Sequence, residues 1–243
     1  VQGDMISKED TMRLGNRLLS MDFGVYPTMF DYCLAMALLY FKEQKCDVVI
    51  LETGLGGTYD STNACGVPDV TVIAKIGFDH MAILGDTLAK IAAEKAGIIK
   101  HGTALVLESQ EKEAMDVLNK AAERADIKTT KVVNLDEIRI LPQKDGKQCF
   151  SYAGYDAVTM KMLGVHQYEN AVAAMLAAEL FFEKYFAGKK NVPERKALQH
   201  AIREGIDRTQ WMGRMELVSN DPFFLMDGAH NSNGVEALKK SLE

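Results

Sequence analysis

The stretch Asp47–Asn63, DVVILETGLGGTYDSTN, decides how this chain is interpreted. Its first part, Val48–Leu51, is a short apolar run rich in β-branched residues, which predicts a parallel strand buried on both faces. Glu52 stands where that strand would end, and the glycine-rich segment Gly54–Gly57 follows. Ligands of open α/β sheets lie outside the carboxyl ends of the strands, and glycine lets backbone approach them closely. The pattern therefore indicates a metal–phosphate site. The alternative is an ordinary glycine-rich turn with Glu52 as an exposed acid.

The segments around this stretch alternate between helix and strand. Helices are predicted over residues 7–21, 28–44, 86–97 and 112–125, and strands over 70–76 and 104–107. Ser7 and Thr28 are the predicted capping residues of the first two helices. The helix over 28–44 is apolar nearly all round, so we expect it to be buried against the sheet. The alternation is typical of an α/β fold with a mostly parallel, doubly wound sheet in three layers.

The sequence pattern changes near Val132, from strand–helix alternation to short runs of alternating apolar and polar residues. Alternating apolar residues on both sides of the turn Lys144–Lys147 predict a small antiparallel excursion that ends near Met162. Further helices are predicted over 167–186 and 193–205, short strands over 215–218 and 223–226, and a last helix from Asn233. The acidic, proline-bearing turn over 219–222 indicates a domain junction, so we expect one domain over 1–219. Residues 220–243 would begin a second domain, and this piece is too short to fold alone.

Composition excludes several classes of protein. The net charge is −6 over 243 residues and no basic run occurs, which argues against a nucleic-acid partner. No apolar run approaches the roughly 20 residues of a membrane span. Four scattered cysteines lack zinc-site spacing and suit a reducing compartment, so we expect a cytoplasmic protein. The start, VQGDMIS, has no initiator methionine, and we expect the chain to be an incomplete form.

Chemistry-bearing side chains follow several of the predicted strands. Glu52 ends one strand, His80 follows the next, and Asp227 and His230 follow a late one. Magnesium prefers oxygen ligands, few of them from protein, so Glu52 suits it better than His80. Lys95 is unusual, because a lysine in an otherwise apolar helical segment needs a partner. The alternatives are a hydrogen-bonded loop histidine at His80 and a snorkelling ammonium at Lys95.

Four long motifs carry a resemblance to a known family. They are LETGLGGTYDSTN, IGFDHMAILGDTLAKIAAEKAGIIK, LGVHQYENAVAA and GRMELVSNDPFFLMDGAHN. In order and spacing the chain resembles the folylpolyglutamate synthase/dihydrofolate synthase family, which belongs to the Mur-ligase-like superfamily of ATP-dependent amide-bond-forming ligases. The resemblance covers essentially the whole chain.

This resemblance implies a metal site and a nucleotide site. Glu52 and His80 match the family's magnesium-binding residues, and Lys95 matches a lysine that is carbamylated in the superfamily. Carbamylation would turn Lys95 into an anion able to lie near a metal. The residues that match the family's ATP-binding positions are Asn170, Arg214, Asp227 and His230. Lys95, His230 and Arg214 would be the catalytic residues.

The resemblance also implies a substrate site. Thr28 and Phe30, together with Thr58 and Asp60, match regions that line the family's pterin pocket. Family members usually have arginine at Thr58, glutamate at Asp31 and valine or methionine at Thr53, which leaves substrate preference open. No G-x-x-x-x-G-K-[ST] pattern of a P-loop occurs in the chain.

The implied function is the ATP-dependent addition of L-glutamate to a folate or dihydropteroate carboxylate through an acyl phosphate. Phosphoryl transfer needs positioning and charge neutralisation rather than a protein nucleophile, and the chain has no Ser-His-Asp or Cys-His arrangement. The implied partners are ATP, Mg²⁺, the pterin substrate and glutamate, bound by a monomer. Two alternatives stay open: a cell-wall Mur-type amino-acid ligase, and a non-catalytic nucleotide-binding module that lacks the P-loop.

Overall fold

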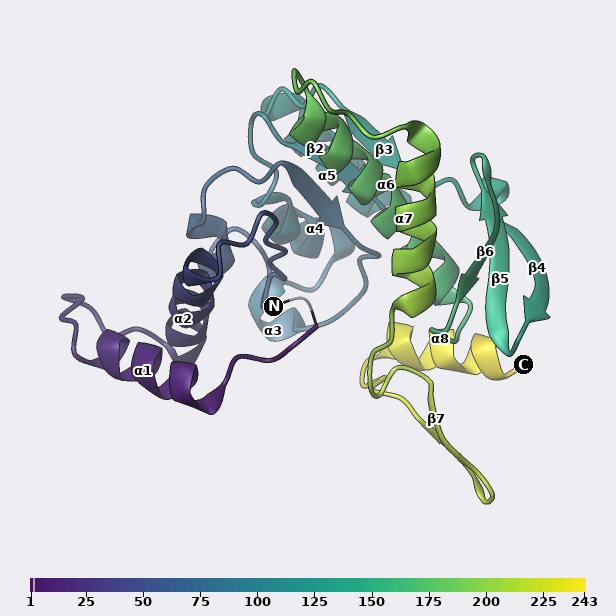
Figure 1. Cartoon of the computed structure of the whole chain (residues 1–243), viewed down its shortest axis with the longest axis horizontal. Helices are drawn as coiled ribbons and strands as arrows, with labels where there is room; N and C mark the ends of the chain where they lie inside the picture. Colours follow the sequence, from purple (N-terminus) through teal and green to yellow (C-terminus); the bar gives the residue numbers. More distant parts are fainter. Residues whose placement is uncertain (2) are drawn as a thin grey trace. The chain divides into compact units, whose positions relative to one another are not determined.

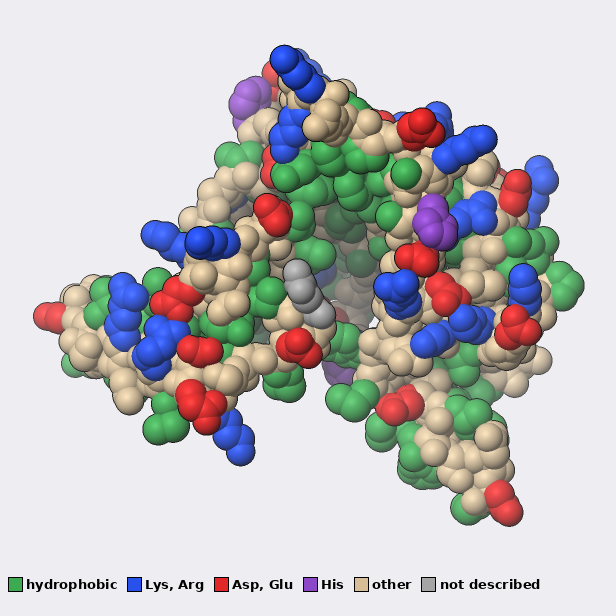
Figure 2. All heavy atoms as spheres, viewed as in Figure 1, with side chains coloured by type: hydrophobic (Ala, Val, Ile, Leu, Met, Phe, Trp, Pro, Cys, Tyr) green, Lys and Arg blue, Asp and Glu red, His purple; other side chains and the backbone are tan. Residues whose placement is uncertain are grey.

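The computed structural model describes Val1 and residues 3–243, which divide into two compact units, residues 1–66 and 67–243. Figure 1 shows the order of their elements. Within the described residues, no helix combines the length and apolar character needed to cross a bilayer. On the face drawn in Figure 2, acidic and basic side chains are interspersed, which fits a modest net charge. The domain boundary expected near residue 219 stays a prediction.

The first unit contains two helices and a 3₁₀ turn. Helix α1 spans Lys8–Leu19, α2 spans Met29–Glu43 and η1 spans Ser61–Ala64. Ser7 caps α1 and Thr28 caps α2, as the capping patterns predict. An ion pair links the two helices: Nη2 of Arg13, in α1, lies 2.6 Å from Oε2 of Glu43, in α2.

The strand predicted over Val48–Leu51 is wrong. These residues are in no strand, and the side chain of Ile50 is 89% exposed. A β-branched run becomes a strand only when a neighbouring strand takes its backbone hydrogen bonds and other elements cover its faces. No described segment pairs with Val48–Leu51, so these residues do not form a strand despite their high β-propensity.

The burial predicted for the helix over 28–44 is also wrong. None of the residues of α2 is buried, although the helix has the expected bounds within a residue. Helix propensity and capping are local and could be predicted correctly. Burial of an all-round apolar helix needs packed neighbours on several sides, and in the first unit α1 is the helix that contacts α2.

The second unit is built on a three-stranded parallel sheet. The strand order is β1, Val70–Ile73, then β2, Ala104–Leu107, then β3, Thr130–Val132. The connections carry helices α3, Met81–Leu84, α4, Leu88–Ala96, and α5, Lys112–Arg124. Strand–helix alternation therefore produces the predicted parallel sheet, although β1 is three residues shorter than expected.

Successive residues of β2 face opposite layers of the core, as the two-residue period of a strand requires. Leu105 and Leu107 pack with residues of α4 and α5, whereas Ala104 and Val106 pack with residues of α6, His166–Phe186. All four side chains are buried. The helices therefore cover both faces of the sheet, which confirms the three-layer α/β architecture.

The predicted antiparallel excursion is confirmed as a second sheet with the order β4-β5-β6. Its strands are Arg139–Lys144, Lys147–Tyr152 and Tyr155–Met160, preceded by the 3₁₀ turn η2, Leu135–Glu137. Helix α7, Arg195–Arg208, packs beside β6. It begins after Pro193 rather than at it, because Glu194 is its N-cap.

The last part of the chain forms a hairpin and a helix. The hairpin joins β7, Glu216–Asn220, to β8, Phe223–Met226, and helix α8 spans Ser232–Leu242. Ser241 of α8 accepts a hydrogen bond at 3.1 Å from the backbone N–H of Val165, just before α6. This hydrogen bond links the end of the chain to the start of α6 within the second unit.

Candidate functional site

His80 lies beyond the carboxyl end of β1. It is the N-cap of α3 and has φ 46° and ψ 37°, a left-handed conformation that is unusual for a residue with a side chain. Its exposed imidazole makes no capping hydrogen bond. Several other residues with side chains share this backbone conformation, among them Lys45 and Asp126, so the role of His80 as a metal ligand stays a prediction.

Asp79 links the loop of His80 to a distant part of the chain. Its Oδ2 accepts a 2.9 Å hydrogen bond from Nδ2 of Asn231, and its Oδ1 accepts one at 2.8 Å from the N–H of His80. The imidazole Nε2 atoms of His80 and His230 lie 3.8 Å and 3.9 Å from this carboxylate. The Asn231 hydrogen bond and then the His80 N–H and the nearby imidazoles lower the pKa of Asp79, with burial opposing them. The structure therefore brings two predicted site residues, His80 and His230, to one carboxylate.

The start of α8 holds this arrangement in place. Asn231 is the N-cap of α8, and its Oδ1 accepts a 2.8 Å hydrogen bond from the N–H of Gly234 while its Nδ2 reaches Asp79. Gly77 lies so close to α8 that a Cβ on it would be 2.1 Å from Nδ2 of Asn233. The loop that carries His80 and the first turn of α8 are thus in direct contact.

Asp227 shapes the loop after β8. Its Oδ1 accepts from the N–H of Ala229 at 2.8 Å, and its Oδ2 accepts from the N–H of Met215 at 2.8 Å. The N–H of Gly228 donates to the carbonyl of Gly213 at 2.8 Å. These bonds tie the DGAHN segment to the segment that carries Arg214, whose exposed guanidinium lies beside Gly228.

His166, in the first turn of α6, lies near the same two segments. Burial lowers its pKa, while the charge of Asp227 raises it and that of Arg214 lowers it again. Its Nδ1 is buried and has no hydrogen-bond partner among the described residues. Gln167 lies 3.1 Å from its Nε2, and the exposed Asn170 donates to Gln167 at 3.0 Å. His166 therefore has one buried nitrogen without a partner among the described residues, and its other nitrogen lies beside an amide that also contacts Asn170.

Lys95 lies in the last turn of α4 and is half-buried. Within the part of the chain that the structure describes, its ammonium makes no hydrogen bond or ion pair. The same residues contain no cluster of three or more side chains that could hold a metal ion by themselves. The magnesium site and the role of Lys95 in it stay predictions.

The predicted substrate residues of the first unit lie together. The carboxylate of Asp60 accepts from the N–H groups of Gly54 and Leu55 at 3.0 and 2.9 Å, so it organises the glycine loop. Burial acts to raise the pKa of Asp60, but these bonds and those from Thr62 lower it overall. A Cβ on Gly54 would lie 3.1 Å from the ring of Phe30. The glycine loop and the start of α2 therefore form one surface.

Asp31 completes that surface. It closes the capping box with Thr28 and accepts a 2.5 Å hydrogen bond from Oγ of Ser61, in the turn after the glycine loop. Thr28 and Phe30 are thus fixed beside the segment of Thr58 and Asp60. Glu52 is exposed and makes no hydrogen bond or ion pair to the described residues. Its convergence with His80 and Lys95 stays a prediction.

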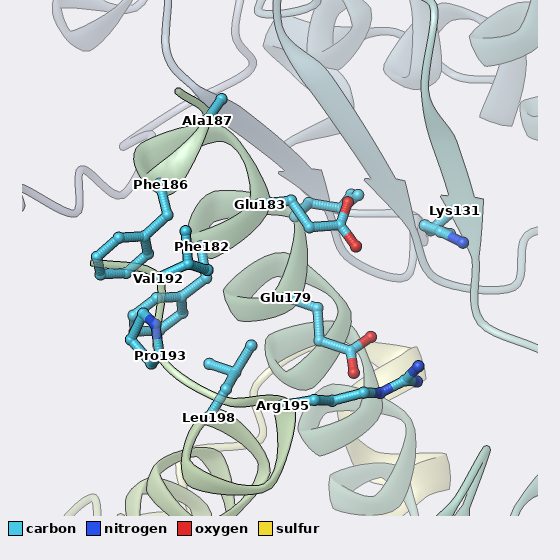
Figure 3. Close-up of a pocket in the computed structure, with 11 residues that line it drawn as sticks. Lys131, Glu179, Phe182, Glu183, Phe186, Ala187, Val192, Pro193, Arg195 and Leu198 are labelled. Carbon is cyan, nitrogen blue, oxygen red and sulfur yellow. The ribbon is translucent and has the colours of Figure 1, made fainter. Parts of the chain in front are cut away.

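A separate hollow of about 390 Å³ lies at the other end of α6. Figure 3 shows the apolar side chains of Phe182, Phe186 and Pro193 grouped there, with Glu179 near Arg195. None of the predicted site residues lines this hollow.

Sequence reasoning missed Asp79, Asn231 and His166 as individual site residues, although all three lie inside the quoted motifs. Their importance comes from contacts between distant segments, which spacing does not show. Glu108 was missed as well. It follows the apolar run of β2 as Glu52 follows Val48–Leu51, so the rule that singled out Glu52 would have found it.

A family model of the Mur ligase middle domain matches residues 25–178 of this chain. The chain therefore belongs to the Mur ligase middle-domain family. Its similarity to folylpolyglutamate synthases and dihydrofolate synthases is also shown. It is 38% identical over its whole length to the dihydrofolate synthase/folylpolyglutamate synthase of Bacillus subtilis, covering 57% of that protein. It is 33% identical to the Mycobacterium tuberculosis enzyme of the same name, with 90% of this chain and 45% of that protein aligned.

Solved structures of folylpolyglutamate synthases are also similar to this chain. Folylpolyglutamate synthase of M. tuberculosis, complexed with ADP and AMPPCP, matches with a TM-score of 0.79 and 29% identity, over 98% of this chain and 55% of that one. The Thermotoga maritima enzyme matches with a TM-score of 0.78 and 30% identity, over 98% and 54%. The chain thus spans about half the length of the relatives that it matches.

Proposed function

We propose that the natural protein containing this chain is an ATP-dependent ligase that adds L-glutamate to a folate or dihydropteroate carboxylate through an acyl phosphate. The observation that carries the proposal is the cluster around Asp79, where the loop after β1 meets the loop after β8. Ligands of open α/β sheets bind outside the carboxyl ends of the strands, and phosphoryl transfer relies on positioning and charge neutralisation, for which the polar groups of these two loops are suited. The similarity to enzymes of this name supports the same reaction.

The chemistry of the second unit fits a nucleotide. The buried Nδ1 of His166 has no partner among the described residues, and Asn170 and Arg214 present further polar groups nearby. Arg214 and His230 would offset phosphate charge, and Asp227 would hold the loop that presents His230. A related solved structure is an FPGS–AMPPCP–folate complex, which supports ATP as the co-substrate.

Glu52 and His80 are proposed to hold magnesium. When bound, the ion would neutralise charge on the nucleotide phosphates. His80 suits this role because its imidazole is exposed and its backbone is held in a left-handed conformation by the Asp79 contact. Glu52 suits it because its exposed carboxylate has no partner among the described residues. Thr28, Phe30, Thr58 and Asp60 would then line the pterin side of the site, on the surface where α2 meets the glycine loop.

Lys95 is proposed to be carbamylated. A half-buried ammonium without an ion pair is a poor arrangement for a lysine, whereas a carbamate would carry the negative charge that suits a nearby cation. Supplying ¹³C-labelled bicarbonate to the natural protein should produce a carbamate carbon signal. Lys95→Arg should lack the signal, and Lys100→Arg, in the following turn, should keep it. A wild-type protein without the signal would contradict the modification.

The activity is tested by incubating the natural protein with ATP, Mg²⁺, glutamate and either dihydropteroate or tetrahydrofolate. Mass spectrometry should show a product heavier by one glutamate residue with at least one acceptor. Glu52→Ala and His80→Ala should each lower kcat/KM. The loss of transition-state stabilisation that this fall measures should be several kcal/mol, roughly the contribution of a metal clamp. A product formed only with a UDP-sugar acceptor would identify a Mur-type ligase instead. Nucleotide binding without any product would identify a non-catalytic module. We also propose that the protein is cytoplasmic and monomeric.

A further inference from the structure

The backbones of β1 and β2 stop pairing after Ile73 and Leu107, but side chains continue the connection between them. The last backbone bond runs from the N–H of Glu108 to the carbonyl of Ile73 at 3.0 Å. Beyond it, Oε2 of Glu108 accepts from the N–H of Lys75 at 2.6 Å. Glu108 is 3% exposed whereas Lys75 is exposed, so the accepting side of this bond is buried.

Gln110 extends the same connection by one more step. Its Oε1 accepts from the N–H of Ile76 at 2.8 Å, and its Nε2 donates to the carbonyl of Ala74 at 3.0 Å. One amide thus takes the place of a neighbouring strand for residues 74–76. Ile76, which is 2% exposed, directly precedes Gly77 and the loop that carries His80.

Helix α6 braces the segment that supplies these side chains. Oε1 of Glu169 accepts a 2.6 Å hydrogen bond from the N–H of Ser109, between Glu108 and Gln110. Glu169 is adjacent to Asn170, a predicted nucleotide-binding residue, so the brace connects the nucleotide side with the exit of β1. The loop of His80 is then held from both ends: at residues 74–76 by Gln110 and Glu108, and at Asp79 by Asn231.

We propose that Glu108 and Gln110 are positioning residues that set the backbone of the loop carrying His80, and through it the affinity of the site for a divalent cation. The proposal rests on the proposed function, in which His80 is a magnesium ligand. Groups that orient metal ligands without touching the metal change its affinity by about 10- to 100-fold. Neither side chain was singled out from the sequence.

The protonation state of Glu108 determines which substitution preserves its hydrogen bond to Lys75 and which removes it. Burial, with the nearby charge of Glu169, raises the pKa of Glu108 to about 7, against the Lys75 N–H bond and the Lys75 charge. The acid is therefore partly protonated near neutral pH, and an amide oxygen can replace its accepting oxygen. Glu108→Gln should keep the bond from Lys75, whereas Glu108→Ala should lose it.

Two readouts test the proposal in the natural protein. Hydrogen exchange should be faster over residues 74–80 in Glu108→Ala and in Gln110→Leu, and should stay near the wild-type rate in Glu108→Gln. In the same variants, the concentration of Mn²⁺ that half-saturates the protein in the presence of a non-hydrolysable ATP analogue should rise by about tenfold. Glu108→Gln should again resemble the wild type.

Thr103→Val is the matched control. Oγ1 of Thr103 makes a buried 3.0 Å hydrogen bond with Thr71, at the opposite ends of the same two strands. Its loss should lower stability without changing exchange over residues 74–80 or Mn²⁺ binding. The positioning role would be excluded if Thr103→Val raised both the exchange rate over residues 74–80 and the half-saturating Mn²⁺ concentration. It would also be excluded if Gln110→Leu raised neither of these two quantities. Absence of ligase activity in the wild type would overturn the proposed function instead, and the exchange data would still decide the positioning role.

Discussion

At the scale of single residues, Asp79 makes the contacts on which the site depends. Its carboxylate accepts hydrogen bonds from the N–H of His80 and from Asn231, which lies 152 residues further along the chain. Charge-assisted hydrogen bonds are stronger than neutral ones, and this one joins two loops that carry predicted phosphate and metal groups. The bond should therefore act as an energetic link between the loops.

A double-mutant cycle measures this link. The variants Asp79→Ala, Asn231→Ala and the double variant should show a coupling of about 1 kcal/mol in the free energy of unfolding. Denaturant titration gives the three values. The exposed ion pair of Asp86 and Lys90 serves as a control and should show no measurable coupling. Additive effects at Asp79 and Asn231 would show that the bond does not connect the loops.

Glu108 predicts a pH dependence of stability. Its pKa is raised from an ordinary value near 4.5 to about 7 by burial, so the folded state binds more protons than the unfolded state between these values. Its contribution is fully present below about pH 4.5 and is lost as pH rises through about 7. Between pH 5 and pH 8 the wild type should lose about 2 kcal/mol more than Glu108→Gln. Urea titrations at both pH values measure this, and equal losses would contradict it.

At this scale, the signal that the sequence carries is a residue type at a strand end, and the roles assigned from it stay predictions. It selected His80, His230 and Asp227, which the structure places around two connected loops. It did not select Asp79 or His166, because their roles depend on which distant segments meet. Residue spacing determines the neighbours of a side chain along its own helix or strand, but not across the fold.

At the scale of elements, the first turn of α8 is seated against the loop after β1. A Cβ on Gly77 would lie 2.1 Å from Nδ2 of Asn233, closer than any packed contact. Asn233 would have to rotate away, which should disturb the turn that Asn231 caps. A side chain at Gly77 would therefore be accommodated only if Asn233, which is exposed, changed its conformation.

Gly77→Ala should therefore lower the free energy of unfolding by about 1 kcal/mol, the low end of overpacking costs. Asn233→Ala introduced into the same variant should recover most of the loss, since it removes the atoms that collide. Thermal and urea unfolding of both variants provide the measurement. If the second substitution only added to the loss, the contact between Gly77 and α8 would not be the cause.

The elements predicted correctly are those with local signals. Capping residues located α1 and α2, and strand–helix alternation located the parallel sheet. The strand over Val48–Leu51 was not predicted correctly, because a strand is stable only with a paired neighbour. The same limit explains why α2 was expected to be buried: its apolar surface shows that it can be covered, but not that it is.

At the scale of the whole molecule, the two compact units carry different parts of the proposed reaction. Residues 1–66 hold Glu52 and the proposed pterin surface, and residues 67–243 hold His80, Lys95 and the proposed nucleotide groups. The order of strands and helices indicated the fold class, and four motifs in the same order and spacing indicated the family. The division after Gly66 was not predicted, because Val48–Leu51 and the glycine loop after it were expected to belong to the same parallel sheet as the later strands.

The most direct test of this account follows oxygen from the acceptor to phosphate. The natural protein is given ATP, Mg²⁺, glutamate and a dihydropteroate or tetrahydrofolate acceptor whose reacting carboxylate carries ¹⁸O. An acyl phosphate predicts that one ¹⁸O leaves with inorganic phosphate and that the other stays in the new amide. Mass spectrometry should find one labelled oxygen in each released phosphate. Glutamate addition with unlabelled phosphate, or phosphate release that needs no acceptor, would contradict the account.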